Sequence, residues 1–332
     1  MSEKIYMGID LGTSRSALVS NNGVEKVTLS VVGWPKDLIA RQMLKQNLLF
    51  GRDALKHRLS LNVVYPLEKG VIKEDEQEKT MAQELIKHLI TAVEAPSGAK
   101  VYGIIGVPAK ASVQNKQVVA DIAKTVMDYA AVISEPFAVA YYAGRLDNAM
   151  IIDVGAGTVD ICRMHGTVPE EEDQITLYKG GDYIDKVFYD TLRSTYSTAN
   201  FTLNMAREIK ERHSFVYNVT RSVSAVFPVN GKPEVFDVTN ELKSACESIV
   251  PEIVEAVKKL IATYDPEFQE LLRENIYLAG GGSQIEGLAD MIAAGLADLG
   301  GAKVECIDDP LFAGARGALK LAMDMPEEYW MD

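Results

Sequence analysis

The sequence contains few cysteines and no long apolar run, and both absences narrow the class of protein. Its three cysteines, Cys162, Cys246 and Cys306, are far apart in the chain and odd in number. Neither a disulfide framework nor a Cys-x-x-Cys metal site is expected, and the cysteines are interpreted as reduced apolar residues of a cytoplasmic protein. No apolar stretch reaches the length of a membrane span, and the acidic start MSEKIYMGID predicts neither a signal peptide nor a transit peptide.

Positive charge is also scarce. The 332 residues include 34 lysines and arginines against 47 aspartates and glutamates, which gives a formal net charge of -13 at pH 7. This balance favours solubility and argues against a surface for nucleic acid or anionic membrane. The four histidines share no spacing typical of metal ligands. With 47% hydrophobic and 24% charged residues, a chain of this length predicts two globular domains or one duplicated architecture.

Two similar segments indicate a duplication. MGIDLGTSRS at 7–16 and IIDVGAGTVD at 151–160 each join an apolar strand to an aspartate, a glycine turn and a small hydroxyl residue. The surrounding pattern predicts a hairpin of 6–9 with 17–20, a helix over 80–95, a strand over 101–107, a helix over about 241–264 and a glycine-ended strand over 275–282. We expect a duplicated α/β unit rather than a solenoid repeat.

The two glycine turns are predicted to bind phosphate. Without bulky side chains, successive backbone N–H groups can point at one oxyanion. The hydroxyl groups of Thr13, Ser14 and Thr158 add further donors. Two such hairpins facing each other would bring Asp10 and Asp153 together, which costs free energy unless a cation lies between them. Magnesium suits this position because it keeps several of its waters and uses few carboxylates.

A third glycine segment, AGGGSQIEG at 279–287, follows a strand and precedes a helix. Consecutive glycines are typical of a tight turn, but they also allow a base or ribose to lie against bare backbone at a helix N-terminus. The segment is not a Gly-x-Gly-x-x-Gly fingerprint with an acidic partner, and the chain contains no Walker loop. Excluding these two common nucleotide folds leaves a fold built from paired hairpins.

Taken in order, these motifs resemble those of the actin superfamily, which includes actins, bacterial actin filaments, chaperone ATPases and sugar kinases. IDLGTS at 9–14 and IDVGAGTVD at 152–160 are similar to its two phosphate loops, and LAGGGSQIEGL at 278–288 is similar to its adenosine loop. IIGVPA and ARGALKLA resemble its two connecting segments. The ordered set runs from residue 9 to residue 322 and so covers nearly the whole chain.

Within the superfamily, the sequence most resembles the MamK family of bacterial actins, which organise magnetosomes, and more distantly MreB. The likeness rests on GVPAKAS with the NK after it, GTVPEEEDQITLYK and the closing MPEEYW. It implies an actin-like, ribonuclease H-like duplicated α/β fold with a nucleotide cleft between two halves. The first half is expected over 1–145 plus a C-terminal helix at 318–332, with a small lobe at about 33–62. The second is expected over 146–317, with a small lobe at about 181–250.

The resemblance also implies the residues of a site for ATP or ADP with Mg²⁺. Asp10 and Asp153 would hold the metal, and Glu135 would orient the attacking water, so that Glu135 and Asp153 are the expected catalytic residues. The residues expected to bind nucleotide are Asp10, Gly12, Thr13, Ser14, Gly155, Ala156, Gly157, Thr158, Gly181, Lys210, Glu211, Gly280, Gly281 and Gly282.

Two of these positions have alternative readings. Glu135 also suits a plain helix N-terminus, where the helix dipole favours negative charge. Actin carries a lysine shortly after its first phosphate loop, where this chain has Ala17, and whether Arg15 helps the phosphates instead is open.

Three classes of protein share this machinery. A sugar kinase would need a sugar pocket and a base aimed at a hydroxyl group, and a chaperone would need a peptide-binding domain after residue 332. The sequence therefore predicts a polymerising ATPase that couples ATP hydrolysis to filament turnover. An MreB-like or plasmid-segregating filament and a sugar kinase are the alternatives. The implied partners are further copies of the chain in a head-to-tail, two-stranded filament and magnetosome-associated proteins, in the cytoplasmic cytoskeleton, without nucleic-acid binding or membrane insertion.

Overall fold

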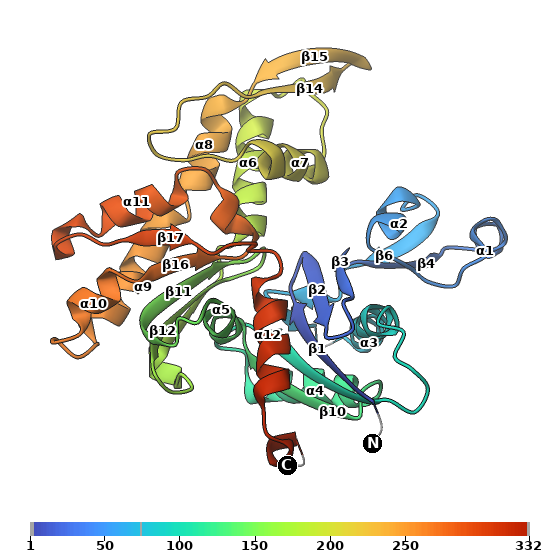
Figure 1. Cartoon of the computed structure of the whole chain (residues 1–332). Coiled ribbons are helices and arrows are strands. Elements are labelled where there is room, and N and C mark those ends of the chain that lie inside the picture. The colour runs from blue at the N-terminus through green and yellow to red at the C-terminus, as the bar shows by residue number, and fades with distance from the viewer. Residues whose placement is uncertain (1–2, 74, 331–332) are drawn as a thin grey trace.

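The structure is a computed structural model that describes residues 3–73 and 75–330. Residues 1–2, 74 and 331–332, which the sequence assigns to the first half, lie outside the described part. Figure 1 shows two sheets with helices packed on both, and a smaller lobe extending from each of them. Within the described residues, no helix is long and apolar enough to cross a membrane.

The first sheet has the strand order β10-β9-β1-β2-β3. Its strands are β1 (Lys4–Leu11), β2 (Arg15–Ser20), β3 (Glu25–Leu29), β9 (Lys100–Val107) and β10 (Tyr129–Ser134). Helices α3 (Glu76–Thr91) and α4 (Val113–Lys124) bury apolar side chains against it. The expected hairpin and strand are present. The helix expected over 80–95 begins four residues earlier, because the side chain of Asp75 accepts hydrogen bonds from the first free N–H groups.

The second sheet repeats this topology with the order β13-β12-β11-β16-β17. β11 (Asp147–Val154) pairs antiparallel with β12 (Val159–His165) and parallel with β16 (Ile276–Ala279), as β1 does with β2 and β9. β13 (Gln174–Leu177) and β17 (Val304–Cys306) complete the sheet. Each sheet therefore places a hairpin with a glycine turn at the same position of its strand order.

The helices of the second sheet correct one expectation. They are α6 (Gly181–Thr195), α7 (Leu203–His213), α8 (Thr239–Glu247), α9 (Val250–Ala262), α10 (Gln269–Arg273) and α11 (Leu288–Gly295). The single helix expected over about 241–264 was wrong, because this segment forms α8 and α9. Pro251 stands in the first turn of α9, where it cannot donate a hydrogen bond to the preceding turn, so the first helix ends at Glu247.

Each sheet carries a smaller lobe, and in Figure 1 the lobe of the first sheet lies at the right and that of the second at the top. The lobe of the first sheet consists of β4 (Val32–Pro35), α1 (Leu38–Leu44), β5 (Leu49–Phe50), α2 (Gly51–Lys56) and β6 (Leu61–Val64). The short strands β7 (Leu67–Glu68) and β8 (Val71–Ile72) lead from it back to the first sheet. The other lobe contains the hairpin of β14 (Ser224–Val229) with β15 (Lys232–Asp237).

The chain passes between the two sheets through α5 (Glu135–Ala143) and α12 (Ala313–Asp324), which cross at the centre of the molecule (Figure 1). At the crossing, Gly317 lies directly on the backbone of Ala138. A Cβ atom at position 317 would overlap the carbonyl oxygen of Ala138. Only glycine allows this approach, and the two helices are therefore in backbone contact.

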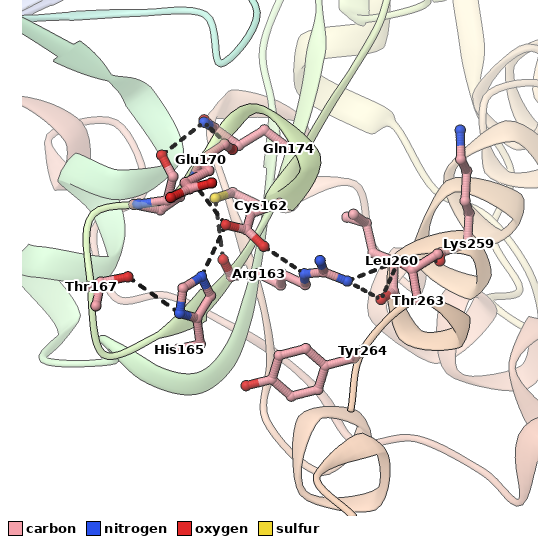
Figure 2. A network of polar contacts seen from close by, with 12 residues as sticks. Cys162, Arg163, His165, Thr167, Glu170, Gln174, Lys259, Leu260, Thr263 and Tyr264 are labelled. Carbon is pink, nitrogen blue, oxygen red and sulfur yellow. Dashed lines mark hydrogen bonds and ion pairs between the residues drawn. The ribbon is translucent and has the colours of Figure 1, made fainter. Parts of the chain in front are cut away.

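A buried ion pair joins Arg163 of β12 to Asp173 in the segment before β13, and Arg163 also donates hydrogen bonds to the end of α9 (Figure 2). Arg163 donates from Nε to Asp173 at 2.7 Å and from Nη1 to the hydroxyl oxygen of Thr263 at 2.8 Å. The side chains of Arg163 and Asp173 are only 6% and 4% exposed. Burial alone would raise the pKa of Asp173, but hydrogen bonds from His165 and Arg163 bring it below its ordinary value. The carboxylate is therefore charged and depends on these partners.

Replacing Arg163 with methionine is expected to lower the free energy of unfolding by about 3–5 kcal/mol, because Asp173 is left charged, buried and without its main partner. The control is Lys303→Met, which removes an ion pair with Glu305 whose side chains are 57% and 47% exposed. That change is expected to cost less than about 1 kcal/mol. Urea unfolding followed by circular dichroism measures both. Equal losses for the two variants would contradict a stabilising role of the buried pair.

Candidate functional site

The glycine turns of the two sheets and the end of β16 face one cavity of about 300 Å³. Every residue that the sequence assigns to a site lies in its wall. They are Asp10, Gly12, Thr13, Ser14, Glu135, Asp153, Gly155, Ala156, Gly157, Thr158, Gly181, Lys210, Glu211, Gly280, Gly281 and Gly282. The fold thus brings these residues together, while their individual roles stay predictions.

The two phosphate-loop segments touch each other at Gly157. A Cβ atom at this position would stand 2.5 Å from Thr13 Oγ1 and 2.7 Å from the Cα of Lys69, so only glycine fits. The Thr13 hydroxyl oxygen accepts a hydrogen bond from the backbone N–H of Gly70 at 2.6 Å. Its proton remains available to donate into the cavity. The close fit of the two turns leaves a backbone-lined cradle suited to an anion.

Four carboxyl groups gather between these turns. Asp10 ends β1, Asp153 ends β11, and Glu135 begins α5. Asp160, which is not among the expected site residues, is the cross-strand partner of Asp153 in the β11–β12 hairpin. The near symmetry of the aspartates in IDVGAGTVD about the turn is the sequence signal that could have identified it.

Burial raises the pKa of all four groups, and the charges of neighbouring carboxylates raise those of Asp153 and Glu135 further. Burial raises the pKa of Asp10 to about 6. The pKa of Asp153 is raised well above its usual value by burial and then by the charges of Asp10 and Asp160. Burial, followed by the same charges and that of Asp153, raises the pKa of Glu135. The cluster therefore disfavours ionisation of all its members unless positive charge is added.

The donor set fits the magnesium ion expected from the sequence. Among the described residues, no group of three or more His, Cys, Asp or Glu side chains could itself enclose a metal ion. Two carboxylates with the remaining positions filled by water and phosphate are the typical environment of magnesium beside a nucleotide. Glu135 Oε1 is buried and has no hydrogen-bond partner in the described structure, which suits a group that receives a water molecule.

The three glycines after β16 have different surroundings: two are packed closely against β11, and one faces open space. Gly280 has a φ of 72°, and a Cβ there would overlap Asp153 Oδ1. A side chain at Gly282 would collide with Val154. Close packing on β11 therefore explains both. Gly281 has only Leu311 Cδ2 nearby, at 4.0 Å from a built Cβ, so its backbone lies open to the cavity. This is the part of the segment against which a flat ligand can lie.

A charged cluster between α6 and α7 contains the expected residue Lys210 and three residues that were not expected in the site, Asp182, Asp185 and Arg207. Arg207 contacts Asp185 through Nε at 2.7 Å and Asp182 through Nη2 at 2.9 Å. Lys210 Nζ lies 2.7 Å from Asp185 Oδ1 and donates to the carbonyl oxygen of Gly181 at 2.9 Å. Acidic residues three apart on one helix and basic residues three apart on the next share faces, so the spacing predicts a charged face on each helix. The ammonium group of Lys210 therefore has both of these partners within the protein, on α6.

Arg15 contacts the opposite side of the cavity. Its Nη2 atom lies 2.7 Å from Glu211 Oε2 on α7. Ala17, at the position of the actin lysine, is buried and packs with Ala315 of α12. In this structure Arg15 is a cation beside the first turn, and its partner is a carboxylate on a helix of the second half.

The chain matches the family described as MreB/Mbl protein over residues 4–328. It is 40% identical to the actin-like protein MamK of Paramagnetospirillum magneticum over 98% of this chain and 94% of that protein. It is 39% identical to the actin-like protein MamK of Magnetospirillum gryphiswaldense over 98% of this chain and 91% of that protein.

Solved structures agree with these sequence similarities. A MamK double helical filament superimposes with a TM-score of 0.95 at 40% identity, covering 98% of this chain and 100% of that one. A non-polymerising MamK mutant bound to AMPPNP has a TM-score of 0.76 at 40% identity, covering 97% and 100%. The expected actin-like duplicated α/β fold is confirmed, and the chain belongs to the MreB/Mbl family of actin-like proteins.

Proposed function

We propose that the chain is an ATPase that binds ATP with magnesium between its two sheets and polymerises head to tail into two-stranded filaments. The observation that carries this proposal is the similarity to a filament subunit. At the same 40% identity, the TM-score is 0.95 for the MamK filament and 0.76 for the mutant that does not polymerise. The overall structure of this chain is thus more similar to that of the filament subunit. We extend the proposal to magnetosome organisation, with magnetosome-associated proteins as partners, because the two MamK relatives match over nearly the whole chain.

We assign the residues that line the cavity to three roles: binding the nucleotide, holding magnesium and orienting the attacking water. The backbone N–H groups of 12–14 and 155–158 bind the phosphates, and the open backbone of Gly281 lies along the adenosine. Asp10 and Asp153 hold magnesium, which neutralises phosphate charge when bound. Glu135, whose Oε1 atom is buried and unpaired, orients the attacking water. The AMPPNP complex of a MamK mutant supports an ATP-like ligand for this chain.

Assembly is the experiment that tests the proposal. Purified protein is expected to pellet in the presence of ATP and magnesium, and negative-stain microscopy of the pellet should show two-stranded filaments. Omitting magnesium is expected to reduce pelleting, because the buried carboxyl groups then repel the nucleotide. A protein that stays monomeric under all nucleotide conditions and phosphorylates a sugar would instead identify a kinase of the same superfamily.

Glu135→Gln is expected to slow phosphate release by about a hundred- to ten-thousand-fold, because the amide cannot take a proton from the attacking water. Nucleotide affinity should change little, since the phosphate turns and the metal aspartates are intact, and the filaments should persist. Phosphate release and pelleting are followed together over time. Glu76→Gln is the control, because it removes a carboxylate from the first turn of α3 that does not line the cavity. If Glu135→Gln hydrolyses ATP at the parental rate, Glu135 has no catalytic role and serves only at the N-terminus of α5.

Asp10→Asn is expected to raise the melting temperature of the nucleotide-free protein by a few degrees while weakening magnesium-dependent nucleotide binding. The folded-state pKa of about 6 lies above the ordinary value of 3.8, so this group destabilises the fold as pH rises through that interval, and the cost is fully present above it. A neutral amide removes the cost at pH 7.5. Thermal unfolding with and without ATP and magnesium measures both effects. Asp190→Asn, at an exposed position of α6, should change neither.

A further inference from the structure

Arg15 and Glu211 form an ion pair that spans the cavity between the two sheets. Arg15 begins β2, directly after the first glycine turn, and Glu211 lies in α7, which packs on α6 in the second half. The Nη2–Oε2 distance is 2.7 Å, and both residues line the cavity. A ligand in the cavity is therefore bordered by a contact that joins one half of the protein to the other.

Glu211 is held on a rigid support. Its neighbour Lys210 is bound to Asp185 and to the carbonyl oxygen of Gly181, and Arg207 on the same helix is bound to Asp185 and Asp182. These contacts fix α7 on α6, and Asp185 is fully buried among them. The carboxylate of Glu211 therefore moves with the second sheet as one body, and its pairing with Arg15 reports how far the two halves have closed.

Other polar contacts between the halves lie away from the cavity. The backbone N–H of Ala109 donates to Asp160 Oδ1 at 2.9 Å, and that of Lys110 donates to Thr176 Oγ1 at 3.2 Å. Neither Ala109 nor Lys110 lines the cavity. Backbone donors of one half thus hold the junction behind the phosphate turns, whereas Arg15 and Glu211 join the halves at the cavity itself.

We propose that Arg15 is a positioning residue that acts through Glu211: the pair is a clasp that keeps the two halves closed over a bound nucleotide and slows its release. This inference rests on the proposed nucleotide binding. Opening the cavity separates the two sheets, so the ion pair must break before the nucleotide leaves. Both side chains are 36% exposed, and an ion pair at that exposure contributes only modestly. Its loss should accelerate release about two- to five-fold.

The experiment measures release of a fluorescent ATP analogue after loading with magnesium and mixing with excess ATP. It uses protein below the concentration at which it pellets, so that assembly does not affect the rate. Arg15→Met and Glu211→Met should each accelerate release, and the double variant should be no faster than the faster single variant. The charge-swapped double variant, Arg15→Glu with Glu211→Arg, should return the rate toward that of the unmodified protein.

The dependence of the release rate on salt concentration is a second measurement, and a general loss of structure would not produce the expected change in it. Raising the ionic strength should accelerate release from the unmodified protein and leave the double methionine variant nearly unaffected, because an exposed pair is screened. Lys258→Met is the matched control, since it removes a 2.7 Å pair with Asp298 within the second half. It should not alter the release rate.

The clasp proposal would be contradicted if the two single substitutions affected the release rate independently of each other. If the accelerations of the two single variants multiply in the double variant, and the charge-swapped variant releases as fast as the double methionine variant, the residues act separately on the ligand. A protein that binds no nucleotide in its unmodified form overturns the proposed function, and the clasp with it. The two failures are therefore distinguishable in one set of measurements.

Discussion

The repulsion between buried carboxyl groups is the constraint on which the rest of the structure depends. Two copies of one hairpin place Asp10 and Asp153 opposite each other, with Glu135 and Asp160 beside them. These side chains alone do not remove the cost of charging the cluster, because burial raises the pKa of each group and neighbouring charges raise those of Asp153 and Glu135 further. A ligand that brings positive charge is therefore expected to stabilise the protein by its own binding free energy. We expect binding of such a ligand to be coupled to closure of the two halves.

Charged contacts in the protein differ in how far they are buried. Two carboxylates of the second half, Asp173 and Asp185, are only 4% and 0% exposed beside their arginine partners. At the cavity between the halves, the pair of Arg15 with Glu211 is about a third exposed. Buried pairs are strongly disrupted when one partner is removed, whereas exposed pairs exchange readily with water. The second half is therefore held as one body, and its junction with the first can change.

The parts of the structure that could be predicted from the sequence are those determined by local pattern. Asp-x-Gly after an apolar strand predicts the tip of a hairpin, because glycine allows the tight turn that the backbone makes there. A second copy of this tip predicts that the two tips face a shared cavity. The pairing of Arg207 with Asp185 depends on the approach of two helices, which local pattern does not specify. Pro251 was a visible signal of a helix boundary, and its effect was obscured by the continuous apolar periodicity on both sides.

The crossing of α5 and α12 has a mechanical consequence. Gly317 places the backbone of one helix on the carbonyl group of Ala138 in the other, so no side-chain layer separates the two helices at this point. Shear motions proceed by the sliding of packed helices over one another. Since a direct backbone contact leaves little room for such sliding, we expect the two halves to rotate about this crossing rather than to slide past each other.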